Sequence, residues 1–263
     1  MTRSRQLNIE VEESFPHLPM APVVEAVIHW QARPQAAIEP DAFRQRLVEM
    51  LPDFVNPTPM RLFQFEAHLE AAAGAESTRR ETWVGLRLAS RDERYIAQFK
   101  TDGFALSRLA PYEKWQTFAA EARRLWRVFV EVAAPVEVQR LGVRFINRIG
   151  LANSDEVGKL LTRPPVRLGS LGLPVRNFVY QSTHDVPGWP YRLNIVDTIQ
   201  LEMLPEAPGP SLILDIDAFT TRPIDIGDAE LENHLERLRW LKNKAFFNLM
   251  TKSAIRRFGK GSR

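Results

Sequence analysis

Three arginines recur at every fourth position in one stretch of this chain, and they are the residues best suited to hold an anion. In the sequence RLGVRFINRIG, Arg140, Arg144 and Arg148 alternate with apolar side chains. A period of two is typical of a half-buried strand, so we expect the three arginines to share one strand face. Because the planar guanidinium can grip carboxylate or phosphate at two points, this face predicts either ion pairs on a solvated sheet or a site for an anionic ligand.

Acidic side chains that could pair with these arginines lie on later predicted strands. Asp215 and Asp217, in the sequence LDIDAF, share one strand face, and Glu202 lies on the strand before them. We expect His68, on a strand of the first half, to join the same polar face. Cross-strand ion pairs contribute only about 0.2–1 kcal/mol each. The pattern therefore predicts pairing for some arginines and a ligand-binding role for any arginine without an acid.

The same acids allow a different interpretation, a site for Mg²⁺ or Mn²⁺. One residue separates Asp215 from Asp217, which places their carboxylates roughly 7 Å apart on one face of a strand. Glu202 could supply a third carboxylate. Oxygen ligands of this kind suit these ions, and two-metal phosphoryl transfer uses them. This alternative predicts a metal-dependent phosphoryl-transfer enzyme or nuclease.

Other signatures of catalysis are missing from the sequence. The chain has no cysteine, which excludes disulfides, thiolate metal sites and a cysteine nucleophile. Its five histidines are isolated, and no glycine-rich phosphate loop or nucleophile elbow occurs. We therefore expect a binding protein rather than an enzyme, with no cofactor, whose ligand is another protein or a small anion.

The C-terminal end is strongly basic and supports a second binding hypothesis. The formal net charge of the chain is +3, yet every charged residue from Arg237 onward is positive. A basic end on a near-neutral body is typical of either a solvated helix face or a nucleic-acid contact. The candidate phosphate-binding residues are Arg237, Lys244, Lys252, Arg256 and Arg257.

Hydrophobic periodicity predicts the elements that must position these residues. The clearest helix covers 112–133, whose apolar positions keep a three-and-four spacing for about six turns. A long helix at 228–258 ends the chain, and shorter helices are predicted at 40–51 and 154–161. The predicted strands cover 23–31, 61–69, 83–89, 94–106, 136–149, 176–184, 192–203 and 211–219.

These elements recur in the same order in both halves of the chain. Each half contains a strand, a helix, three strands and a long helix, which predicts a duplicated unit. We expect an α+β protein in which the two units build one large antiparallel sheet with two long helices packed on it. The predicted division is an irregular leader at 1–21, a first repeat at 22–135, and a second repeat with the basic C-terminal helix at 136–263.

The composition also bears on where the protein works. The chain is 44% hydrophobic and 25% charged, and no run of about eighteen apolar residues predicts a membrane span. The N-terminal residues lack the apolar core of a signal peptide. We therefore expect a cytoplasmic protein of bacterial type that does not bind membranes.

Several stretches together resemble a known family. They are PVVEAVIHW near the N-terminus, YEKWQTFAAEARRLW, RLGVRFINRIG, and LDIDAF before the last helix. With these motifs the chain resembles an uncharacterised bacterial family that is sporadically distributed, and the similarity spans nearly the whole chain. The resemblance implies no activity. The patchy distribution of the family implies an accessory role in mobile genes, such as defence or toxin–antitoxin neighbourhoods.

Overall fold

The computed structural model describes residues 6–70, 74–153, 156–166, 171–173, 175–201 and 209–260, without the side chains of 65–78 and 228. Within these residues, nine strands form one sheet in the order β2-β3-β4-β5-β1-β6-β9-β8-β7, and every neighbouring pair is antiparallel. The strands are β1 (Val23–Pro34), β2 (Phe54–Glu70), β3 (Gly74–Ser90), β4 (Tyr95–Lys100), β5 (Gly103–Leu109), β6 (Pro135–Gly150), β7 (Val179–Asp185), β8 (Tyr191–Gln200) and β9 (Ser211–Thr220).

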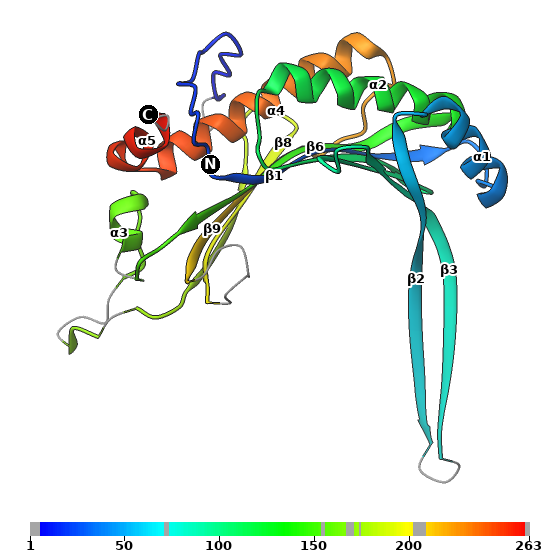
Figure 1. Cartoon of the computed structure of the whole chain (residues 1–263), viewed down its shortest axis with the longest axis horizontal. Coiled ribbons are helices and arrows are strands. Elements are labelled where there is room, and N and C mark those ends of the chain that lie inside the picture. The colour runs from blue at the N-terminus through cyan, green and yellow to red at the C-terminus, as the bar shows by residue number, and fades with distance from the viewer. Residues whose placement is uncertain are drawn as a thin grey trace.

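The helices of the described residues pack on one face of this sheet. Figure 1 shows α2 and α4 side by side along the top of the sheet, whereas the long β2–β3 hairpin projects below it. The predicted α+β class, with a large antiparallel sheet and two long helices on it, is thus confirmed. The helices are α1 (Pro40–Met50), α2 (Trp115–Ala133), α3 (Val157–Leu160), α4 (Asp228–Leu249) and α5 (Lys252–Gly259).

The centre of the sheet is the antiparallel pair β1 and β6, which open the two predicted repeats. Outward from this pair, β5, β4 and β3 follow on one side, and β9, β8 and β7 follow on the other. Among the described residues, the first half contains one strand more than the second, because β2 lies outside β3. This order is compatible with the predicted duplication, which stays a prediction, as does the division into a leader and two repeats.

Helix α2 buries the aromatic stripe that its sequence predicts. Its buried side chains recur with the three-and-four spacing, and Trp126 stacks on Trp30 of β1 with ring centroids 5.2 Å apart. Trp30 also stacks on Phe104 of β5 at 5.7 Å. Offset aromatic stacking adds to the free energy gained by burying these large rings. The layer between α2 and the middle of the sheet is therefore an aromatic core.

The single strand predicted at 94–106 is wrong, because the chain turns back within it. β4 ends at Lys100, and β5 begins at Gly103 and pairs antiparallel with β4. Gly103 has φ = 146°, and a Cβ atom there would overlap the carbonyl oxygen of Trp30. Only glycine fits this close approach, so the hairpin turn depends on a residue that hydrophobic alternation does not reveal.

The single long helix predicted at 228–258 is also wrong. α4 ends at Leu249, and the backbone of Met250 instead bridges to Leu161. α5 then begins with Thr251 as its N-cap, whose side chain accepts a hydrogen bond from the amide of Ala254 (3.2 Å). The capping threonine gives the first amides of α5 a partner, and this stabilises a second helix in a new direction.

Residues 6–22 form no helix or strand, yet they are held against the rest of the molecule. Glu13 accepts hydrogen bonds from Lys244 (2.6 Å) and Trp240 (2.7 Å) of α4. The indole of Trp189 donates to the carbonyl of Leu7 (2.8 Å). The N-terminal segment therefore lies across α4. None of the helices in the described part of the chain has the length and apolar character needed to cross a membrane.

Candidate functional site

The face of the sheet opposite the helices carries the predicted arginines, and we call it the uncovered face. Along β6, Leu141, Val143 and Phe145 are buried toward the helices, so the alternating Arg140, Arg144 and Arg148 point the other way. The predicted alternation of this strand is confirmed. The uncovered face is formed in its centre by Val27, His29, Arg140, Arg144, Ile146, Arg148, Ile213, Asp215, Asp217 and Phe219.

Two of the three arginines form ion pairs with the predicted acids of β9. Arg144 holds Asp215 with two nitrogens, Nε (2.9 Å) and Nη2 (2.5 Å), and Arg140 Nη2 donates to Asp217 (2.7 Å). In the register of β6 and β9, Arg144 lies opposite Asp217, so its pair with Asp215 is diagonal. The expected ion pairing is thus confirmed for Arg140 and Arg144.

Arg148 is the arginine without an acid. Its Nε donates to the hydroxyl of Ser211 (3.1 Å), and its Nη2 is buried with no hydrogen-bond partner. No ion pair joins Arg148 to any acid among the described residues. A buried guanidinium nitrogen without a partner is costly, so Arg148 is the residue of this face with unused capacity for an anionic group.

His29 packs against Arg140 above a glycine. A Cβ atom on Gly142 would lie 2.7 Å from the imidazole of His29, so the ring occupies space that only glycine leaves. Burial, together with the positive charge of Arg140, lowers the pKa of His29 to about 3. The neutral ring therefore accepts a hydrogen bond from Arg140, whose guanidinium also lies 4.0 Å above the Phe219 ring. Arg140 is thereby fixed in place on three sides.

The two acids are almost equally exposed, with Asp215 at 17% and Asp217 at 19%. Burial raises the pKa of Asp217, and the adjacent Arg140 only partly opposes that shift. The two arginines differ more, because Arg144 is 48% exposed and Arg140 is 24% exposed. Arg144 is therefore the more accessible of these two arginines to solvent or a ligand.

Two predicted members of this group are not placed with the arginines. Glu202 lies outside the described residues. The backbone of His68 pairs with Glu76 near the end of the β2–β3 hairpin, far from β6 in Figure 1, so His68 does not belong to the arginine cluster. In the part of the chain that the structure describes, no group of three or more His, Asp or Glu side chains could hold a metal ion.

The predicted basic helix divides into two groups with different surroundings. On α4, Lys244 pairs with Glu13 (2.6 Å), and the guanidinium of Arg237 lies 4.9 Å above the Trp189 ring. On α5, Lys252, Arg256 and Arg257 are exposed and have no acidic partner among the described residues. The break between α4 and α5 therefore separates residues that the sequence predicts on one helix.

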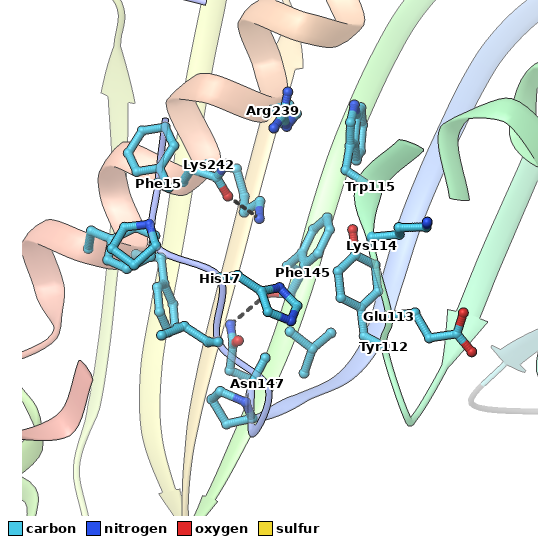
Figure 2. A pocket seen from close by; sticks show the side chains of 18 of the residues that line it. Phe15, His17, Tyr112, Glu113, Lys114, Trp115, Phe145, Asn147, Arg239 and Lys242 are labelled. Carbon is cyan, nitrogen blue, oxygen red and sulfur yellow. Dashed lines mark hydrogen bonds between the residues drawn. The ribbon is translucent and has the colours of Figure 1, made fainter. Parts of the chain in front are cut away.

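A pocket on the helix side brings together candidate binding residues that the sequence did not predict. It lies between the N-terminal segment, the start of α2, β6 and α4, and has a volume of about 210 Å³. Figure 2 shows Lys242, Phe145, Tyr112 and His17 around its interior. Lys242 follows the buried Leu238 by four residues, so both lie on the apolar stripe of α4. A lysine on this stripe is the feature of the sequence that could have predicted a buried cation.

Lys242 is a buried cation with no acidic partner in the described part of the chain. Its Nζ lies 3.6 Å above the Phe145 ring and donates to the amide oxygen of Asn243 (2.5 Å). Burial, with the nearby charge of Arg239, lowers the pKa of Lys242 to about 7. The neighbouring Tyr112 is also buried, which raises the pKa of its hydroxyl. The pocket therefore combines aromatic walls with one amine that titrates near neutral pH.

The comparisons with known proteins do not assign this chain to a group. No protein-family model matches it, and no curated protein matches it significantly. Its function is therefore argued from the uncovered face, the basic end and the pocket.

Proposed function

We propose that this chain is a binding protein, without catalytic activity of its own, that holds another protein against the uncovered face. The observation that carries the proposal is the set of exposed apolar side chains on both sides of that face. Leu62 and Phe63 of the β2–β3 hairpin are 49% and 42% exposed, and as neighbours on a strand they point to opposite faces of the hairpin. Val166, between α3 and β7, and Val179 of β7 are 83% and 65% exposed. Exposed apolar side chains that gather on one surface are typical of protein–protein contact sites.

The position of these side chains supports one partner held from two sides. In Figure 1, the hairpin and the described residues directly before β7 both lie on the side of the sheet away from α2 and α4. The uncovered face lies between them. A protein that contacts both segments would also contact the centre of that face.

The chemistry of the face favours a protein over a nucleic acid. Asp215 and Asp217 balance Arg144 and Arg140, so phosphate would meet carboxylates as well as arginines. Arginine and aromatic side chains such as Phe219, beside aliphatic ones, are typical of protein interfaces. Arg148, which pairs with no acid among the described residues, can take a carboxylate of the partner.

Site-specific photocrosslinking in the native host tests this proposal. A photoreactive phenylalanine analogue replaces Phe63, and as a matched control it replaces Val48, which is 45% exposed on α1 on the other side of the sheet. We expect one protein to crosslink at position 63 and not at 48, and Leu62→Ser with Val179→Ser to abolish the crosslink. Equal capture at both positions, or capture unchanged by the two serines, would contradict the proposal.

The resemblance to a sporadically distributed family suggests where the gene of the partner lies. An accessory binding protein of mobile genes, in a defence or toxin–antitoxin neighbourhood, would bind a product of an adjacent gene. The partner crosslinked at position 63 should then be encoded beside this chain.

A second candidate function, nucleic-acid binding, is favoured by the basic end. Lys159 of α3 lines the same groove as Arg257 of α5, so α3 adds to the charge of the C-terminal helix. None of these cations pairs with an acid among the described residues. The exposed cations of this basic end are Lys159, Lys252, Arg256, Arg257 and Lys260.

Salt-dependent anisotropy with a labelled DNA duplex tests this second function. Replacing Lys252, Arg256 and Arg257 with glutamine should weaken binding and reduce the slope of log affinity against log salt by about 3. The control variant carries glutamine at Arg44, Arg91 and Arg222, three exposed arginines elsewhere. Equal effects of the two triple variants would show only non-specific charge attraction.

A further inference from the structure

The pocket beside Lys242 is a second site, separate from the uncovered face. We infer that it binds a small organic monocarboxylate with an aromatic or apolar body, whose carboxylate pairs with Lys242. The pocket lies on the helix side of the sheet, so this inference does not depend on the proposed partner protein.

The charge of Lys242 has no acidic counterpart among the residues that the structure describes. Its Nζ contacts only a ring and a neutral amide, at Phe145 and Asn243. Burial of an ammonium without an anion is costly, and such groups normally pair or lose their proton. A carboxylate ligand would supply the missing anion and restore the protonated state.

The other charged groups around the pocket leave one buried positive charge to satisfy, because Lys114 is exposed to solvent. Arg239 is already engaged with Glu236 (2.8 Å), which also accepts from the Trp115 indole (2.6 Å). From β6, the residues lining the pocket are uncharged. The titratable groups lining the pocket are His17 from the N-terminal segment, Tyr112, Glu113 and Lys114 before α2, and Arg239 and Lys242 from α4.

The walls of the pocket favour a flat apolar body. Tyr112 packs edge-on against Phe145 with centroids 5.1 Å apart, and Phe15 stacks on Phe247 at 5.3 Å. Aromatic rings on opposite sides suit a planar ligand group. The volume of about 210 Å³ corresponds to roughly seven water molecules at about 30 Å³ each, which limits the ligand to a small molecule.

Calorimetry with phenylacetate and its uncharged counterpart phenylacetamide tests the inference. The wild-type protein should bind phenylacetate at least about tenfold more tightly than phenylacetamide. Lys242→Met should remove this preference. The control Lys114→Met, which removes a charge at the exposed rim of the pocket, should keep the preference. Absence of phenylacetate binding, or equal binding of the two probes to wild-type protein, would overturn the inference.

Proton uptake supplies a measurement that does not need a variant. At pH 8, Lys242 is mostly neutral in the free protein, since its pKa is about 7. Binding of phenylacetate should therefore take up close to one proton, measured as the dependence of the binding enthalpy on the ionisation enthalpy of the buffer. Binding of phenylacetate without proton uptake would show that its carboxylate does not pair with Lys242.

Discussion

Gly142 determines how the centre of the uncovered face is arranged. Because it has no side chain, the imidazole of His29 can lie against β6 and accept a hydrogen bond from Arg140. Arg140 in turn holds Asp217 and covers Phe219. The absence of a side chain at Gly142 thus allows the imidazole of His29, the guanidinium of Arg140 and the carboxylate of Asp217 to contact one another on the uncovered face.

A larger side chain should therefore destabilise the protein at Gly142 but not at Gly150 of the same strand. Gly142→Val would force the His29 ring and Arg140 to move, at a cost of about 1–3 kcal/mol in the free energy of unfolding. The control is Gly150→Val on the same strand, where no atom lies within 4 Å of the added Cβ. Urea denaturation compares the two variants, and equal stabilities would contradict the assigned role of Gly142.

Lys242 should make the stability of the protein depend on pH. Its pKa is about 7 when folded and close to its ordinary 10.5 when unfolded, so the unfolded chain binds more protons between these values. The burial penalty is present in full below pH 7 and is relieved as the pH rises toward 10, by about 1.4 kcal/mol per pH unit.

Lys242→Met should remove this part of the pH dependence. The difference in unfolding free energy between the variant and the wild type should be largest near pH 6 and should shrink toward pH 9. All other titrating groups are shared, so the difference reports Lys242 alone. A difference that does not change with pH, measured by urea denaturation across this range, would show that the lysine stays protonated in the folded protein.

At the scale of elements, the end of α4 and the start of α5 decide where the basic residues lie. Thr251 caps α5 by accepting from the Ala254 amide, and its hydroxyl donates to the carbonyl of Lys159 (2.6 Å). The same side chain thus begins α5 and ties it to α3. This connection brings Lys159 beside Arg257 in one groove.

Loss of this cap should weaken the C-terminal end. Thr251→Ala removes both hydrogen bonds and should lower the free energy of unfolding by about 1–2 kcal/mol. Ser253→Ala, at an exposed position of α5, is the matched control and should change it by less than about 0.5 kcal/mol. Thermal denaturation measures both. A neutral Thr251→Ala variant would show that tertiary packing alone sets the direction of α5.

At the scale of the whole molecule, the β2–β3 hairpin is an extension rather than part of the core. β3 pairs with β4 only from Gly85 to Ala89, and the rest of the hairpin pairs only with itself. Of the hairpin side chains that the structure describes beyond β4, those of 62–64 and 79–82 do not belong to the core clusters. The exposed Leu62 and Phe63 are therefore available to a partner without a cost to the fold.

Shortening the hairpin should separate binding from stability. Replacing residues 63–81 with Asn-Gly joins Leu62 to Thr82, which are opposite in register, through a two-residue turn. For this variant, the photoreactive residue replaces Val179. We expect the midpoint of urea denaturation to stay unchanged and the partner protein to be no longer crosslinked. Retained crosslinking would exclude the hairpin from the interface, and a large loss of stability would show that it supports the core.

The sequence by itself determined the features that depend on local periodicity. The spacing of apolar residues in α2 and the alternation in β6 are set by helix and strand geometry, so they could be predicted without neighbours. The face shared by Asp215 and Asp217 follows for the same reason. The division of one predicted strand into β4 and β5 could not be predicted in this way. It depends on the close approach of Gly103 to Trp30, and these two residues are far apart in the chain.

Only the tertiary structure decided which charges have partners. Arg144 and Arg148 look alike in sequence, yet register with β9 gives Arg144 an acid and leaves Arg148 beside Ser211. Lys242 looks like any lysine of a basic helix, yet packing of α4 against Phe145 buries it without an anion. Pairing and burial depend on which strands and helices meet, and local sequence patterns do not contain that information.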